Sequence, residues 1–277
     1  MKIHLVITFS FLAFFSCKKE NLIKKQFTKN ATQIVYDQKT WYELRKRDEN
    51  LKVEVIDTVC INQRKRAKSD IDKGKLTYFY YMGMVKIFRS NREMAELLSK
   101  FNIGIDSTHT TCFRPALGFE YYCYENEMRI AIDKKYGNNF IDSLRFQAEK
   151  KYVLKNPNKI YKFEDCDTIA RYPRATNYKE HFDNYELDYF KNFNYPKGYI
   201  YKNEKFYSYT TADFILHKDG SITNIVIETS FQNPNNEKFR KLFDKRMSDF
   251  IKKTKWIPAR SAGIIVNSIM EISITYK

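Results

Sequence analysis

The chain has 277 residues, of which 43% are hydrophobic and 16% aromatic, so it can bury the core of one large or two modest domains. Its net charge of +16 favours anionic partners such as lipid head groups, although a solvated lysine-rich surface explains the same charge. Only 8 glycines and 6 prolines are present, which excludes a long flexible or proline-rich linker.

The first residues are similar to the export signal of a lipoprotein. Lys2 gives a positive start, and residues 3–15 are almost wholly apolar but too few to span a bilayer as a helix. A small residue then precedes Cys17, as in a lipobox, although Phe14 and Phe15 are bulkier than the usual pattern. This resemblance implies a signal peptide over residues 1–16, lipid attachment at Cys17 and an outer-membrane lipoprotein that faces the periplasm or the cell surface. The alternatives are an uncleaved anchor or an ordinary signal with a chance cysteine.

Four further cysteines are candidates for disulfides, because an exported chain enters an oxidising compartment. They are Cys60, Cys112, Cys123 and Cys166, which allow three connectivities. We expect Cys112 to pair with Cys123, because the short run between them could bring two neighbouring strands into register. No Cys-x-x-Cys motif occurs, and the spacing of His109 and Cys112 is not repeated elsewhere. We therefore expect no metal site and no cofactor.

A tether over residues 17–39 is predicted to lead into an uncharacterised α+β domain over residues 40–160. In chain order we first expect a strand at 53–59, a charged loop at 64–68 and a buried strand at 76–82. A helix follows from Ser90, with Glu93 in a capping box. We then expect a hairpin formed by 119–124 and 128–132, and a helix over 140–152. Charge clusters such as Arg64 to Lys68 usually form solvated surfaces.

The elements predicted after residue 167 are helix, hairpin, helix and strand. Asn177 is suited to cap a helix that runs from 178 to 193, and Asp219-Gly220 favours a type I′ turn between strands 209–218 and 221–229. Ile222 is out of phase with Ile225, which indicates a bulge. A second amphipathic helix covers 239–251, and a strand with one buried face covers 264–276. We expect a small antiparallel three-stranded sheet with two helices, within an α+β chain.

Several local motifs appear in this region in a fixed order. Tyr195-Pro196 follows the first helix, a D-G-x-I-x-N turn begins at Asp219, and W-I-P-A begins at Trp256, before Gly263. Together they resemble the TonB C-terminal domain, over residues 167–277. The resemblance implies a module that binds an extended peptide beside its last strand through backbone hydrogen bonds.

The same resemblance implies which residues contact the partner. The expected contacts are Tyr195, Pro196, Ile265, Asn267 and Ile269. The alternatives are that the last strand has no partner, as at any open sheet edge, and that Tyr195 is a core aromatic that ends a helix. Trp256 and Pro258 are expected to serve the fold rather than the contact.

The sequence therefore predicts a lipid-anchored binding protein of the cell envelope whose partner is a peptide segment or an outer-membrane β-barrel receptor, and not a nucleic acid. A TonB-type energy transducer is the alternative, but the expected cleavage before Cys17 would remove the anchor helix of that class, and 6 scattered prolines do not form its proline-rich spacer. An exported enzyme is a third class. A thiol site of Asp106, His109 and Cys112 is its one candidate, and no Gly-rich phosphate loop, H-E-x-x-H or G-x-S-x-G motif occurs. We therefore predict no catalytic residues, and the sequence does not define the oligomeric state.

Overall fold

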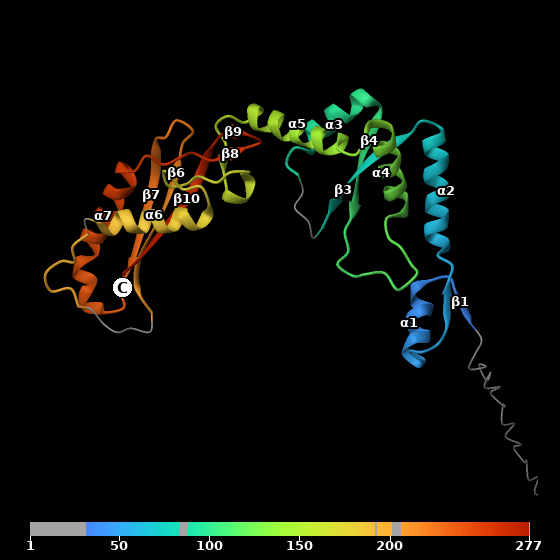
Figure 1. The fold of residues 1–277 in the computed structure, drawn as a ribbon, viewed down its shortest axis with the longest axis horizontal. Helices are drawn as coiled ribbons and strands as arrows, with labels where there is room; N and C mark the ends of the chain where they lie inside the picture. Colours follow the sequence, from blue (N-terminus) through green and yellow to red (C-terminus); the bar gives the residue numbers. More distant parts are fainter. Residues whose placement is uncertain (1–31, 84–87, 192, 201–205, 277) are drawn as a thin grey trace, which may run out of the picture. The chain divides into compact units, whose positions relative to one another are not determined.

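The computed structural model describes residues 32–83, 88–191, 193–200 and 206–276, which form a mixed α+β fold (Figure 1). The chain divides into two compact units. The first is Met1–Val59 with Pro115–Tyr121, and the second is Cys60–Arg114 with Tyr122–Lys277. Cys17 and the predicted signal lie outside the described residues. Within those residues, no helix combines the length and the apolar character that a bilayer crossing requires.

The first unit is a small parallel β-α-β arrangement. Strand β1 (Gln33–Val35) pairs with β2 (Val53–Val55), and α1 (Gln38–Arg47) connects them. β1 therefore lies inside the range that the sequence analysis assigned to the tether. The helix begins after Asp37, whose side chain accepts a 2.9 Å hydrogen bond from the Thr40 N–H. Gly118 has a positive φ of 91°, and a Cβ there would lie 2.9 Å from the Val55 Cβ, so this approach requires glycine.

The second unit begins with helices around a two-stranded parallel sheet. Its elements are α2 (Thr58–Asp72), β3 (Leu76–Met82), α3 (Asn91–Leu98), the 3₁₀ turn η1 (Ser99–Phe101), β4 (Ile103–His109), α4 (Cys123–Tyr136) and α5 (Phe140–Lys155). β3 and β4 pair in parallel over their full length. Met94 and Leu98 of α3 are fully buried against Ile132 of α4 and Ala148 of α5. This cluster is the core of the N-terminal part of the unit.

The structure confirms the strand at 76–82 and the helices that follow Ser90 and Asn139, and it corrects several other predictions. The strand predicted at 53–59 ends at Val55, and Thr58 begins α2. Residues 64–68 belong to α2 and are not a loop. The hairpin predicted across 119–132 is wrong, because Cys123, Met128 and Ile132 share the buried face of α4. The Ser90 side chain makes no capping bond and instead donates to Glu149.

One disulfide joins Cys60 of α2 to Cys123 of α4, with 5.4 Å between their Cα atoms. The predicted pairing of Cys112 with Cys123 is therefore wrong. Cys123 begins a helix rather than a strand, and α2 supplies its partner. Cys112 and Cys166 are free thiols, the first exposed and the second half-buried.

The C-terminal sheet has four strands in the order β5-β10-β6-β7. They are β5 (Ile160–Tyr161), β6 (Ser208–Leu216), β7 (Ile222–Ser230) and β10 (Asn267–Tyr276). β10, β6 and β7 are antiparallel neighbours, whereas β5 pairs in parallel with the start of β10. The sequence predicts three of these strands, and β5 is a fourth that no local pattern indicates.

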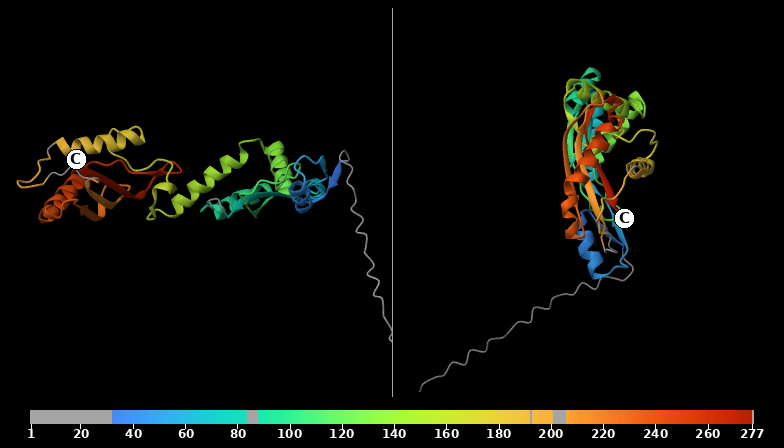
Figure 2. Two further views of the ribbon diagram at one scale, coloured as in Figure 1. Left: turned by 90° about the horizontal axis from the view of Figure 1, so that it is seen from below. Right: turned by 90° about the vertical axis from the view of Figure 1, so that its left-hand side faces the viewer.

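The remaining elements of this region are the 3₁₀ turns η2 (Phe163–Asp165) and η3 (Pro234–Phe239), the helices α6 (Tyr178–Lys191) and α7 (Arg240–Lys253), and the short hairpin of β8 (Arg260–Ser261) with β9 (Ile264–Ile265). Asn177 caps α6 as predicted, because its Oδ1 accepts from the Glu180 N–H at 2.9 Å. α6 runs beside β10 (Figure 2).

The β6-β7 turn differs from the predicted type I′. Within the turn at 218–220 only Gly220 has a positive φ (+83°), whereas a type I′ turn needs two such residues. The His217 N–H donates to Ser221 O, so a three-residue loop connects the strands. The predicted bulge is confirmed by a register shift opposite Asp213 and Ile215, where Asn224 has φ +53°.

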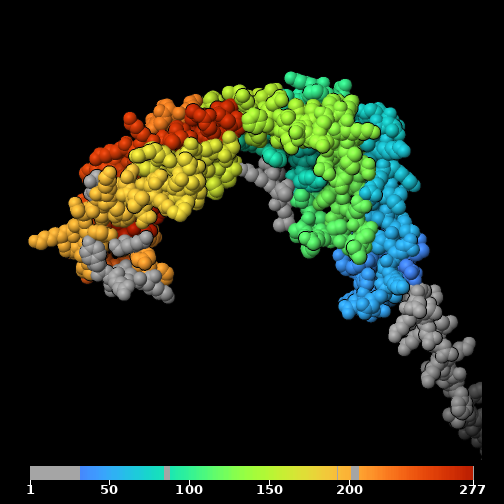
Figure 3. All heavy atoms as spheres, in the orientation of Figure 1, coloured from blue at the N-terminus to red at the C-terminus, as the bar shows by residue number. Residues whose placement is uncertain are grey.

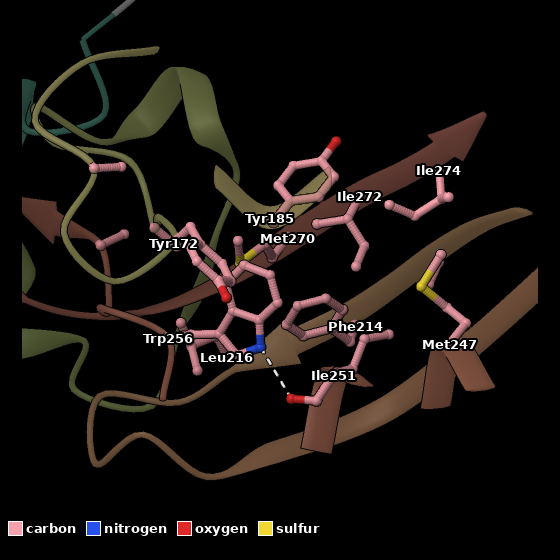
Figure 4. Close-up of a cluster of buried hydrophobic side chains, with 14 of the residues drawn as sticks. Tyr172, Tyr185, Phe214, Leu216, Met247, Ile251, Trp256, Met270, Ile272 and Ile274 are labelled. Atoms are coloured by element: carbon pink, nitrogen blue, oxygen red, sulfur yellow. Dashed lines mark hydrogen bonds between the residues drawn. The ribbon is translucent and has the colours of Figure 1, made fainter. Parts of the chain in front are cut away.

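Both helices and the sheet share one core (Figure 4). Met270, Ile272 and Ile274 of β10 are buried against Tyr185 of α6 and Met247 of α7. Trp256 lies in the same cluster, and its Nε1–H donates to Ile251 O at 3.0 Å. Alternate residues of β10 face the other way, so one face of the sheet is packed and the other is exposed.

Candidate functional site

The outer edge of β10 is the feature closest to the predicted binding site. Its inner edge pairs with β6 from Ser268 to Tyr276. The Tyr185 hydroxyl donates to the backbone O of Ser273 and accepts from its N–H. The backbone N–H and C=O of Ser273 therefore point away from β6, toward the outer edge. Because backbone direction alternates along a strand, Ile269 and Glu271 also point to the outer edge.

Part of this edge is occupied from within the molecule. β5 pairs with Asn267 and Ser268, and the geometry of a parallel ladder in this register sets the N–H of Ile269 against Tyr161. Further along the strand, the Tyr185 hydroxyl bonds to the backbone groups of Ser273 and lies 3.0 Å from Ser273 O. Between these two, the C=O of Ile269 and both backbone groups of Glu271 have no partner in the ranges that the structure describes.

A groove of about 720 Å³ lies along this unpaired stretch, and we call it the edge groove. Its walls come from η2, from the segment before α6 and from the first turns of α6. Aromatic and aliphatic side chains dominate the lining, among them Phe163, Ile169, Tyr178, Phe182 and Ile269. Phe163 and Tyr178 are 72% and 68% exposed, so apolar surface is available to a ligand. In Figure 3, the yellow atoms around α6 adjoin the red atoms of the closing segment on one face.

A half-buried arginine, Arg89, fixes the η2 wall of the groove. Arg89 donates to the backbone O of Asp165 at 3.2 Å and to Ser261 Oγ at 2.6 Å. It also pairs with Glu149 of α5 at 2.9 Å, and its guanidinium lies 4.9 Å from the Tyr161 ring centre. η2 is thereby tied to α5, to β5 and to the β8-β9 hairpin.

Burial keeps two of the titratable groups that line the edge groove, His181 and Cys166, uncharged at neutral pH. Burial lowers the pKa of His181, whose Nδ1 accepts from the Tyr172 N–H at 2.9 Å. Burial raises the pKa of the Cys166 thiol to about 11, against a lowering by Arg89. Cys166 therefore lacks the thiolate that a nucleophile or a metal ligand needs.

The opposite edge of the sheet, formed by β7, is poorly suited to pair with another strand. β7 carries the bulge at Asn224, and bulges twist an edge away from incoming strands. Arg240 of α7 bonds to the backbone O of Thr229. Of the two sheet edges, that of β10 is the one with unpaired groups beside a groove.

The five predicted contact residues do not come together in one place. Ile269 is 46% exposed and lines the edge groove. Asn267 is only 7% exposed; it pairs with β5 and accepts from the Lys218 N–H. Ile265 belongs to the β8-β9 hairpin and is exposed.

Tyr195 and Pro196 lie near the far end of β10. The Tyr195 ring is 4.9 Å from Phe193 and 6.5 Å from Tyr276, in an aromatic cluster that joins the main core. Pro196 is half-buried and its backbone O accepts from the Tyr199 N–H.

Sequence reasoning missed Phe163, Tyr178 and Tyr185 as groove or edge residues. Phe163 follows β5, and no local signal announces that two-residue strand. Tyr185 lies within the helix predicted over 178–193, and nothing in a helical pattern reveals its bond to Ser273. A scan against protein-family models found no matching family, and searches of curated proteins and of solved structures found no match.

Proposed function

We propose that this chain is a lipid-anchored binding protein of the cell envelope whose C-terminal module, similar to the TonB C-terminal domain, takes up an extended peptide segment by strand addition to β10. The observation that carries the proposal is the edge groove beside the unpaired C=O of Ile269 and the two unpaired backbone groups of Glu271. An outer-membrane β-barrel receptor with a flexible segment is the partner class that fits this location.

The dimensions of the unpaired stretch limit the ligand. β5 occupies the edge before it and Tyr185 occupies the edge after it, so a bound segment pairs with about three residues of β10. Three backbone hydrogen bonds at about 0.5–1.5 kcal/mol each give only a few kcal/mol. The remaining affinity comes from apolar ligand side chains placed against Phe163, Tyr178 and Phe182.

Replacing Glu271 with proline tests strand addition directly. Proline removes the unpaired N–H and is tolerated on an edge strand, whereas Glu271→Gln removes the same charge and keeps the N–H. We expect peptides selected from a displayed library of random segments, of about seven residues, to bind the full-length protein in detergent. Fluorescence anisotropy should then show binding to Glu271→Pro at least about tenfold weaker than binding to Glu271→Gln, the variant that lacks the same charge but keeps the N–H. Equal binding to all three proteins, or a library that yields no binder, contradicts the proposal.

The lipid anchor is tested at Cys17. We expect cells that express the chain to incorporate radiolabelled palmitate into it, and we expect the Cys17→Ser variant to lose both the label and its recovery in the membrane fraction. Cys112→Ser is the matched control, because it removes an exposed thiol and leaves the signal unchanged. Retention of the label in Cys17→Ser would show that the proposed attachment site is wrong.

A further inference from the structure

Two carboxylates lie directly opposite each other beside the edge groove. Glu271 of β10 is paired in register with Asp213 of β6, and both side chains are on the exposed face of the sheet and line the groove. Directly opposed like charges on a sheet face destabilise it. Placing Glu271 opposite Asp213 therefore lowers the stability of the sheet, and nothing in the fold requires two carboxylates at these positions.

Neither carboxylate forms a salt bridge with any lysine or arginine in the described part of the chain. This contrasts with the chain as a whole, in which 49 basic residues outnumber 33 acidic ones. Ile269 lies two residues before Glu271 on β10, and Ile215 lies two residues after Asp213 on β6, so both isoleucines share the exposed face with the pair. The exposed face beside the groove is thus apolar and acidic on a strongly basic protein.

A further polar group lines the groove without a partner. Ser268 is 1% exposed, and its Oγ has no hydrogen-bond partner within the residues that the structure places. Buried hydroxyl groups are nearly always bonded, so Ser268 is an unusual feature of this wall, but its Oγ is closed to solvent and a ligand in the groove does not reach it. The exposed and unpaired backbone groups of Glu271 are what favour a polar chain as the ligand rather than a purely apolar one.

We infer that the peptide bound at this edge alternates apolar residues with lysine or arginine. This inference rests on the proposed function. In a strand added beside β10, alternate side chains point to opposite faces of the sheet. One set enters the groove against Phe163 and Phe182. The other set lies over the exposed face, where a long basic side chain reaches Glu271 and extends toward Asp213.

Three labelled peptides of about seven residues test this, in which valine alternates with lysine, threonine or glutamate. Fluorescence anisotropy with the full-length protein should show the lysine peptide binding about tenfold tighter than the threonine peptide, and the glutamate peptide binding most weakly. The net charge of +16 by itself would favour the glutamate peptide, so the expected order runs against the protein's overall field.

Single charge removals locate the effect. Glu271→Gln should reduce the preference for the lysine peptide about fivefold and leave binding of the threonine peptide unchanged. Asp142→Asn is the control, because it removes an equal charge at an exposed position of α5 outside the groove, and it should change neither.

The outcomes separate the two proposals. If the three peptides bind equally and Glu271→Pro weakens all of them, strand addition stands and the basic specificity is wrong. A preference for the glutamate peptide also overturns the inference. If none of the peptides binds, and the random library likewise yields no binder, both proposals fail.

Discussion

Replacing Trp256 with alanine should lower the free energy of unfolding of the second unit by about 3–5 kcal/mol. The indole is 5% exposed and packs against Tyr172 and Phe214, with ring centres 5.5 and 5.6 Å away. Alanine leaves a cavity between α7 and the sheet, and it also leaves Ile251 O without the Nε1–H donor. This loss is large for a protein whose total stability is about 5–15 kcal/mol.

Urea unfolding followed by far-ultraviolet circular dichroism measures this loss. The chain has 2 tryptophans, and the other one, Trp41, lies in the first unit, so its fluorescence reports separately on that unit in the variant. Trp256→Phe is the matched control, because it keeps one aromatic ring and loses the hydrogen bond together with part of the indole volume; it should cost about 1–3 kcal/mol. A loss below about 1 kcal/mol for the alanine variant would mean that Trp256 is not a core residue.

Removing the disulfide should lower the free energy of unfolding by about 4 kcal/mol. Cys60 and Cys123 are separated by 63 residues, and closing a loop of that size restricts the unfolded chain strongly. The double variant Cys60→Ser/Cys123→Ser isolates the effect, and Cys112→Ser controls for the substitution of a cysteine that is free and exposed.

Fluorescence of Trp256 in a Trp41→Phe background follows the unfolding of the second unit in these variants. Thiol labelling of the denatured, unreduced protein provides an independent check. Cys112 and Cys166 should react, whereas Cys60 and Cys123 should react only after reduction. Labelling of Cys123 without reductant, or an unchanged unfolding midpoint in the double variant, contradicts the pairing.

The sequence was informative where structure depends on local patterns. Helices α6 and α7 and the long strand β10 follow from apolar residues at helical or alternating spacing, and Asn177 is recognisable as a cap from its position before Tyr178. The exposure of Ile269 follows from the same alternation. Each of these depends only on neighbours within a few residues.

The rest depends on contacts between distant parts of the chain. β5 has two residues, and only its pairing with β10 defines it, so no local signal could predict that Asn267 would be buried. Aromatic residues near Tyr122 suggested a strand, but Tyr122 has φ +60° and a helix follows it. That error also misdirected the cysteine pairing, because it placed Cys123 in a hairpin.

The first unit takes residues from two separate stretches of sequence, so the chain passes between the units three times, after Val59, Arg114 and Tyr121. Ala116 and Phe119 fill the core around Val35. A protein that begins at residue 60 would therefore not contain the second unit alone. Its Ala116 and Phe119 would be exposed without the rest of the first unit, and exposed apolar residues favour aggregation. Both units must be produced as one translation product, and a protease would have to cut at several places to release either one intact.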